Sequence, residues 1–263
     1  MTRRDELKAP DELKAIVEEY LEGLAFWPDL HAQAESMHYA LVEMGGKRIR
    51  PVISLATGEA LGAPAEQILP AAAALELVHN FSLVHDDLPA LDGDLERRGK
   101  ASVWAAYGEG TAVLAGDGLL AEAFRLASSY PTPNVVRELA EATLGMIGGQ
   151  YLDTMVPGAE LATVHGLKTG RLFYAAVTLA LWAAEVPEGD QGPWREFAGE
   201  LGLLFQAVDD ILDGDGYVAA EGVEGARRVA DEAADRARER LRAIAADTAV
   251  LEEIVDGLAV RTS

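Results

Sequence analysis

Apolar residues recur along most of this chain at the spacing of one face of an α-helix. One stripe comprises Ile16, Val17, Tyr20, Leu21 and Leu24, and a second runs through positions 197–212. No run of alternating polar and apolar residues is long enough to predict a strand. The pattern therefore predicts an all-α protein.

Glycine and proline interrupt these apolar stretches at the intervals expected of helix boundaries. The interruptions indicate roughly ten helices joined by short loops. Pro70, Pro133 and Pro193 are each expected in the first turn of a helix, where the missing N–H costs no hydrogen bond. No repeat, low-complexity segment or linker divides the chain, so we expect residues 1–263 to form a single domain.

Composition adds little to this fold but limits the location of the protein. Hydrophobic residues make up 49% of the chain, which is enough for a sizeable core, and there is no cysteine for disulfide or thiolate chemistry. Met1–Lys14 is charged and lacks the apolar stretch of a signal peptide. The longest uncharged apolar run, Leu172–Ala184, is too short to span a bilayer. We expect a cytoplasmic protein without a membrane span.

A large excess of acidic residues makes the few basic ones informative. The net charge is −22, with 44 acids against 22 bases, and such a chain is repelled by nucleic acid and by anionic membranes. Many of the cations nevertheless cluster in three short segments, at 47–50, 97–100 and 168–171. Ordinary solvated charges are one interpretation of these clusters, and contact with an anion is the other.

Carboxylates line one side of the apolar helix expected at 197–213. Gln206, Asp209, Asp210 and Asp213 lie at successive intervals of three, one and three positions and fall on one stripe of the helix. Crowded carboxylates in an apolar setting are costly unless cations neutralise them. A solvated acidic face is the better explanation for one such motif alone.

A second acidic cluster changes that balance. Asp86 and Asp87 end another apolar helix, with His79 two turns upstream. Asp92 lies six positions beyond Asp86, and Pro89 is expected to loosen the turn between them so that the two carboxylates meet. Two clusters of hard oxygen ligands suit Mg²⁺, which completes its shell with water and substrate phosphate. Cations nearby are what a diphosphate site requires.

Six motifs occur in an order that resembles the trans-isoprenyl diphosphate synthases, the farnesyl and geranylgeranyl diphosphate synthase family. They are GGKRIRP at 45–51, HDDLPALDGDLERRGK at 85–100, LAGDGLL at 114–120, GGQYLD at 148–153, KTGRLF at 168–173 and FQAVDDILD at 205–213. The resemblance covers nearly the whole chain from about residue 35. It implies an antiparallel helix bundle around a central cavity, the isoprenoid synthase fold, and a homodimer.

The resemblance also assigns roles to individual residues. It implies isopentenyl diphosphate and an allylic diphosphate (dimethylallyl or geranyl) as substrates, with Mg²⁺ as cofactor. The expected isopentenyl diphosphate contacts are Lys47, Arg50, His79 and Arg98. The expected allylic contacts are Arg97, Lys168, Thr169 and Gln206. The expected metal ligands are Asp86, Asp92 and Asp209, and together with Lys168 they form the expected catalytic set. Asp210 and Asp213 are weaker ligand candidates. Gln150 and Asp153 are expected to contact and support the ligands rather than the substrates.

Phe81 is the residue expected to limit product length. It lies five positions before Asp86, or roughly 7.5 Å deeper along the same helix. Its side chain leans toward the helix N-terminus, away from the metals, and an aromatic ring here accompanies short products in the family that the chain resembles. Phe81 could equally be ordinary core. We expect farnesyl diphosphate, with fifteen carbons, rather than the twenty-carbon geranylgeranyl diphosphate.

The chain departs from the family pattern in three places. Residues 101–104 replace the usual PTxH, and Arg261 is the only basic residue near the C-terminus. The family's lysine-bearing loop after the second aspartate motif is missing, because the chain passes from Asp213 almost directly to Tyr217. These departures leave two alternatives open: a catalytically weak subunit that regulates another synthase, and a terpene cyclase.

Overall fold

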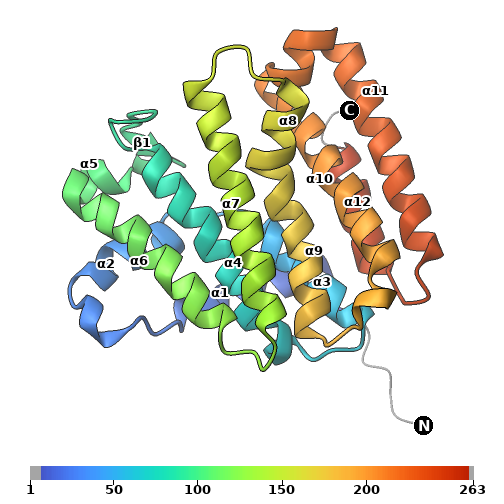
Figure 1. The fold of residues 1–263 in the computed structure, drawn as a ribbon, viewed down its shortest axis with the longest axis horizontal. Helices are drawn as coiled ribbons and strands as arrows, with labels where there is room; N and C mark the ends of the chain where they lie inside the picture. The colour runs from blue at the N-terminus through green and yellow to red at the C-terminus, as the bar shows by residue number, and fades with distance from the viewer. Residues whose placement is uncertain (1–6, 261–263) are drawn as a thin grey trace.

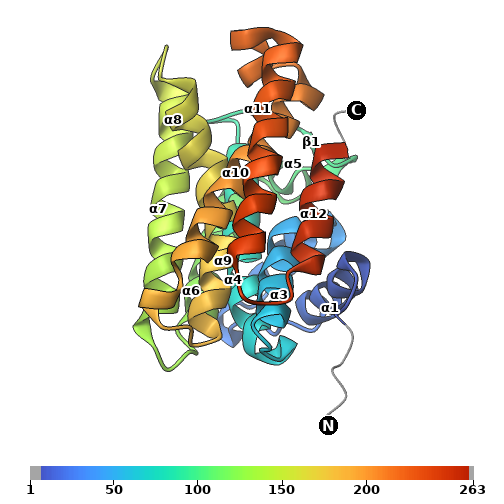
Figure 2. The same ribbon diagram turned by 90° about the vertical axis from the view of Figure 1, so that its right-hand side faces the viewer.

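The computed structural model describes residues 7–260 and shows a bundle of α-helices in which most helices run parallel or antiparallel (Figures 1 and 2). The prediction of an all-α fold is confirmed. The Arg261 departure lies outside the described residues. The α-helices are α1 (Pro10–Glu22), α2 (Gln33–His38), α3 (Ile49–Ala60), α4 (Ala65–Asp86), α5 (Val103–Tyr107), α6 (Glu109–Ala127), α7 (Pro133–Met155), α8 (Leu161–His165), α9 (Arg171–Ala183), α10 (Gly192–Asp213), α11 (Gly216–Ala243) and α12 (Ala249–Val260).

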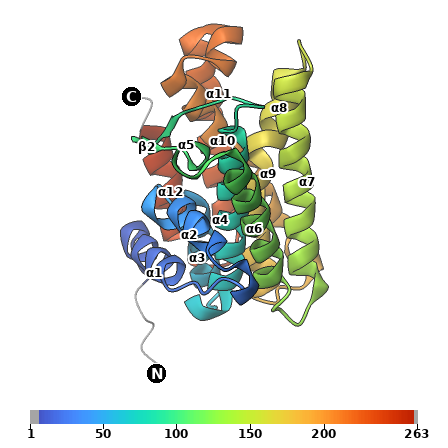
Figure 3. The same cartoon turned by 90° about the vertical axis from the view of Figure 1, so that its left-hand side faces the viewer.

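Shorter segments connect these helices. Two 3₁₀ turns lie at η1 (Pro28–Leu30) and η4 (Glu188–Asp190), and two π-helical segments lie at η2 (Tyr39–Glu43) and η3 (Gly166–Gly170). Figure 3 shows the left-hand side of the view in Figure 1, where α6 lies between α2 and α7. A single hydrophobic core runs from α1 to α12 across the described part of the chain.

Helix α4 is the centre of the bundle, where it packs against α3, α6, α7 and α9. Its apolar residues surround the helix axis on all sides, as is typical of a helix buried in a core. Within residues 7–260, α4 is the one helix that is long and apolar enough to cross a membrane. Because 72% of its apolar window is buried inside the protein, its composition is explained by its place in the core.

The prediction for Pro70 is wrong, whereas Pro133 and Pro193 do lie in the first turns of α7 and α10. Helix α4 begins at Ala65, so Pro70 lies inside it. The hydroxyl of Tyr130 repairs the interrupted helix: it accepts a hydrogen bond from the Ala71 N–H (3.0 Å) and donates one to the Gln67 carbonyl (2.6 Å). A tyrosine about sixty positions away therefore makes an interior proline tolerable.

A two-stranded ribbon follows α4, where the sequence predicted no strand. Strands β1 (Glu96–Arg97) and β2 (Lys100–Ala101) pair antiparallel, with Arg97 opposite Lys100. The two turn residues, Arg98 and Gly99, have φ of 54° and 76°. Positive φ at both central residues is the requirement of a tight hairpin turn, and strands of two residues are too short to produce an alternating pattern.

Candidate active site

Three helix C-terminal ends, those of α4, α7 and α10, meet at one end of the bundle (Figure 1). Each carries a carboxylate near its last turn, namely Asp86, Asp153 and Asp213. The carbonyl groups at a helix C-terminus already carry partial negative charge, so these carboxylates are unfavourable there without a positive partner. This end of the molecule is therefore suited to hold cations.

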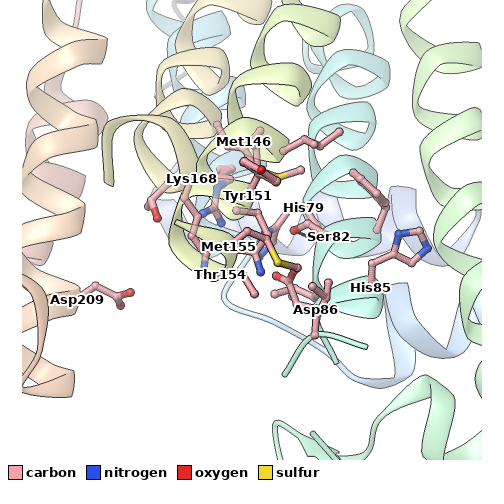
Figure 4. A pocket seen from close by; sticks show the side chains of 18 of the residues that line it. His79, Ser82, His85, Asp86, Met146, Tyr151, Thr154, Met155, Lys168 and Asp209 are labelled. Atoms are coloured by element: carbon pink, nitrogen blue, oxygen red, sulfur yellow. Dashed lines mark hydrogen bonds between the residues drawn. The ribbon is translucent and has the colours of Figure 1, made fainter. Parts of the chain in front are cut away.

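A cavity of about 490 Å³ opens in this region. Its inner wall is mainly apolar and includes Phe81, Met146 and Phe205. Figure 4 shows Asp86 and Asp209 on opposite sides of its opening, with Lys168 on the helical segment between them. The arrangement combines a dry interior with a charged entrance, which suits a ligand with a hydrocarbon tail and an anionic head.

Asp86 is perturbed by its position at this entrance. Its pKa is raised to about 6, chiefly by burial, while Lys168 lowers it in part and the nearby Asp92 contributes to the rise. The Asp92 N–H donates to the Asp86 carbonyl (2.9 Å), so the turn after α4 does fold Asp92 back onto the end of the helix. The Asp86 carboxyl, with its raised pKa and a second carboxylate beside it, is poised to accept a cation.

A second cavity of about 470 Å³ adjoins the first and shares Arg50, His79 and Asp209 with it. Lys47, Arg97 and Arg98 also line it. Its walls thus bring together the residues predicted to bind isopentenyl diphosphate, and they also include Arg97, which was predicted as an allylic contact. Burial lowers the pKa of His79 well below its usual value, and Arg50, Arg98, Arg48 and Arg97 lower it further. His79 is therefore a neutral imidazole beside four guanidinium groups.

Arg50 is held by aromatic rings rather than by a carboxylate. Its guanidinium lies 4.5 Å from the ring centre of Phe173 and 5.9 Å from that of Phe205. Burial lowers its pKa to about 10, and its Nε has no hydrogen-bond partner among the described residues. A buried donor without a partner is costly, so the site is incomplete without an acceptor such as a diphosphate oxygen.

The hairpin formed by β1 and β2 carries Arg97 and Arg98, whose guanidinium groups have different hydrogen-bond partners. Arg98 donates to the Gly45 carbonyl, which ties the hairpin to the glycine loop before α3. Arg97 makes a bidentate ion pair with the buried Asp87 (2.5 to 2.9 Å). Arg98 therefore faces the second cavity with hydrogen-bonding capacity left, whereas Nε and Nη2 of Arg97 are already engaged by Asp87.

Arg48 has a structural place, although the sequence groups it with Lys47 and Arg50. It adopts a left-handed conformation (φ 52°) that turns its side chain inward, where it is 2% exposed. There it pairs with the buried Glu76 (2.8 Å) and with Glu18 (3.0 Å). The buried ion pair joins α1 and α4 to the loop that carries Lys47, and so fixes the floor of the second cavity.

A third cavity of about 300 Å³ lies between α8, η3 and α10. Lys168 pairs with Asp153 there (2.5 Å), and Thr169, Asp209 and Gln206 also line it. Asp209 is the residue that lines all three cavities. Burial raises its pKa, Asp213 raises it further, and Lys47 lowers it. Asp209 therefore lies where both proposed anion sites and the apolar cavity meet.

The structure thus brings most of the predicted residues to one region, and it adds three that sequence reasoning missed. Glu76 lines the basic cavity, His165 lines the third cavity, and Tyr151 lines the apolar one. Glu76 precedes His79 by three positions on α4, so helical spacing could have placed it on the same face. No local pattern marks His165 or Tyr151. Asp92 lines none of the three cavities and contacts Asp86 from the rim.

The carboxylates fit magnesium only in part. Within residues 7–260, no three His, Asp or Glu side chains lie close enough together to hold a metal ion by themselves. The donors are nevertheless hard carboxylate oxygens on two facing helices, and Mg²⁺ commonly takes one or two carboxylates and completes its shell with water and substrate phosphate. The residues present therefore suit magnesium ions held jointly with a diphosphate, by Asp86 and Asp92 on one side and Asp209 on the other.

Comparison with known proteins agrees with this geometry. The farnesyl diphosphate synthase of Escherichia coli is 36% identical over 294 residues, covering 94% of this chain and 97% of that one. The geranylgeranyl diphosphate synthase of Cyanophora paradoxa is 41% identical over 194 residues, covering 68% of this chain but 64% of that one. The solved geranyltransferase of Legionella pneumophila superposes with a TM-score of 0.85 at 33% identity and covers 96% of both chains.

A family model described as polyprenyl synthetase matches residues 31–225, a range that runs from α2 to the first turns of α11 and includes every residue discussed above for the two aspartate motifs. The chain belongs to the polyprenyl synthetase family.

Proposed function

We propose that this protein condenses isopentenyl diphosphate head to tail with an allylic diphosphate, and that farnesyl diphosphate is its main product. The observation that carries the proposal is the joining of an apolar cavity of about 490 Å³ to a cation-lined cavity of about 470 Å³ at Arg50, His79 and Asp209. Two diphosphates can thus lie side by side, with one tail inside the protein.

The allylic diphosphate binds with its head between the two aspartate motifs and its tail in the apolar cavity. Lys168, held by Asp153, faces Asp86 there. Asp86, Asp92 and Asp209 would hold magnesium, which would supply positive charge beside the departing diphosphate. The cavity walls exclude the water that would quench an allylic cation.

The isopentenyl diphosphate binds in the second cavity through Lys47, Arg50 and Arg98, while the neutral His79 donates or accepts one hydrogen bond. Its double bond then lies beside the shared wall, where it attacks the allylic cation. Transfer of a proton from the new unit to an oxygen of the departed diphosphate then forms the new double bond and completes the product. No side-chain nucleophile takes part.

Product length is proposed to depend on Phe81. The side chain is buried, lines the apolar cavity and packs edge to face against His85 (5.3 Å between ring centres). This contact with the next turn fixes the ring across the path of a lengthening tail. The twenty-carbon alternative requires the tail to pass Phe81.

Incubation of the purified protein with magnesium, isopentenyl diphosphate and either dimethylallyl or geranyl diphosphate tests the proposal. After removal of the diphosphate, mass spectrometry should identify farnesol as the main product. The Asp86→Ala/Asp209→Ala double variant is the control and should give none.

Other outcomes contradict specific parts. Geranylgeraniol would refute the assigned length, and a cyclic hydrocarbon would refute condensation in favour of cyclisation. No turnover alone, together with stimulation of another synthase, would identify a regulatory subunit.

We also propose that two copies form a homodimer through α6 and α7. Exposed apolar side chains follow one face of α7 at Leu144, Ile147, Tyr151 and Met155, and Leu114 on the neighbouring α6 is also exposed. Leu144 is 69% exposed and Tyr151 61%, which is unfavourable for a free surface. Light scattering after gel filtration should give twice the chain mass, and Leu144→Glu should give a monomer.

A further inference from the structure

The connection between α10 and α11 is short but closely attached to the active site. Only Gly214 and Asp215 separate the two helices. The Asp210 carbonyl accepts hydrogen bonds from the N–H groups of Gly214 (2.9 Å) and Asp215 (3.2 Å). Gly222 then breaks the helical backbone of α11 (φ 76°, ψ 168°), so residues 216–221 form a short first segment of that helix. This short connection lies at the place where the family that it resembles carries a loop.

The Asp210 carboxylate is buried (2% exposed) and fully engaged with the protein. Its Oδ1 accepts from Gln206 Nε2 (2.6 Å), and its Oδ2 accepts from the backbone N–H of Tyr217 (2.7 Å). Tyr217 is the second residue of α11, whose first N–H groups have no partner within the helix. Asp210 thus caps the first segment of α11 from the preceding helix.

Gly216 shows how closely α11 approaches this carboxylate. A Cβ atom at Gly216 would lie 2.1 Å from Asp210 Oδ2, and its φ is +46°. Any side chain here must push the start of α11 away from Asp210. By contrast, a Cβ atom at Gly214 meets nothing within 4 Å, although its φ of +74° is equally left-handed.

His165 extends this contact to the segment that carries Lys168 and Thr169. Its Nδ1 lies 3.5 Å from Asp210 Oδ2, and its ring packs edge to face on Tyr217 (5.5 Å between centres). His165 ends α8, and η3 follows directly with Lys168 and Thr169.

The segment η3 has no room to adjust independently of its neighbours. A Cβ atom on Gly149 of α7 would lie 2.3 Å from the Lys168 nitrogen, and one on Gly202 of α10 would lie 3.3 Å from Gly170. A shift at the start of α11 must therefore pass through His165 to η3.

We propose that Asp210, His165, Gly216 and Tyr217, the Asp210 clasp, position η3 for binding the allylic diphosphate in place of a loop between α10 and α11. Asp210 is then a positioning residue rather than a metal ligand. This inference rests on the proposed function for its substrate, but the clasp itself is a property of the ligand-free fold.

Gly216→Ala tests the clasp, with Gly214→Ala as the matched control for left-handed strain. Gly216→Ala should raise KM for the allylic diphosphate by about 10- to 100-fold, the scale expected for a displacement near 1 Å, and leave KM for isopentenyl diphosphate within about twofold. More diphosphate should be released per molecule of lengthened product. Gly214→Ala should leave all three quantities near wild type.

Two further measurements separate positioning from other roles. Asp210→Asn should leave the magnesium concentration for half-maximal rate unchanged, whereas a metal ligand would raise it. Hydrogen exchange in the ligand-free protein should be faster at 166–170 in Gly216→Ala and unchanged at 49–60, a result that holds even if the substrates are misassigned.

Any of three results would overturn the inference. They are an equal rise in KM for both substrates in Gly216→Ala, an equally large rise in allylic KM in Gly214→Ala, and unchanged hydrogen exchange at 166–170 in Gly216→Ala. If Gly216→Ala does not fold, Tyr217→Ala replaces it, because it keeps the N–H bound to Asp210 and removes only the ring on His165. The same selective rise in allylic KM is expected, and an unchanged KM overturns the inference.

Discussion

Replacing Arg48 with methionine should destabilise the protein far more than any loss of surface charge. Met keeps the apolar stem but leaves the buried Glu76 carboxylate (2% exposed) without its ion-pair partner, and the hydrogen bond that remains is from the Asn80 amide at 3.2 Å. Breaking a buried ion pair by removing one partner costs about 3–5 kcal/mol. The free energy of unfolding of a typical domain is roughly 5–15 kcal/mol, so this loss is a large part of the total stability.

A double-mutant cycle isolates the cause. Glu76→Gln removes the buried charge and keeps a hydrogen-bonding group near Asn80, so Arg48→Met/Glu76→Gln should regain about 2 kcal/mol or more relative to Arg48→Met. Urea unfolding followed by circular dichroism at pH 7.5 gives all four free energies. Arg240→Met is the control: its ion pair with Glu196 (2.9 Å) is about half exposed, and its loss should cost under about 1 kcal/mol.

Two results would refute the reasoning. The first is an Arg48→Met variant within about 1 kcal/mol of wild type. The second is a double variant no more stable than Arg48→Met, which would mean that the loss reflects the changed loop and not the unpaired carboxylate.

Three other perturbations test the site itself. Phe81→Ala should shift the product from fifteen to twenty or more carbons by mass spectrometry, and an unchanged product from a folded, active variant would mean that another residue limits the length. Lys47→Ala should raise KM for isopentenyl diphosphate about tenfold or more with little change for the allylic substrate, because one charge-assisted contact of about 1.5–3 kcal/mol is lost; a selective allylic defect would contradict the assignment. Burial raises the Asp86 pKa from 3.8 to about 6, so the metal-free fold holds a proton that the unfolded chain has released between these pH values. Its stability should therefore fall as pH rises through that window, and Asp86→Asn should flatten the fall in urea titrations from pH 4 to 7; an identical slope would argue against the shift.

Sequence reasoning located the two aspartate motifs because hard ligands and helical spacing are local properties. It misjudged Pro70 because the hydroxyl that repairs the helix belongs to Tyr130, on a distant segment. It grouped Arg48 with the anion-binding cations because a left-handed backbone, which turns the side chain inward, leaves no mark in a run of basic residues.

The same limit applies to Asp210, which the motif alone presents as a possible ligand. Its hydrogen bonds to Gln206 and Tyr217 depend on how α11 returns to the site, and that return depends on three-dimensional packing. Spacing therefore predicted which residues would meet, but not which of them the protein would already have paired.

The carboxylates at the ends of α4, α7 and α10 have a consequence for the lifetime of the protein in the cell. Each is held against the negative end of its helix, so the ligand-free fold carries repulsion that bound cations and substrates relieve. A ligand that binds only the folded state stabilises it by about 2.7 kcal/mol at one hundred times its Kd. Proteases act on the unfolded fraction, so scarcity of substrate should shorten the half-life of this enzyme, and abundance should raise its amount without new synthesis.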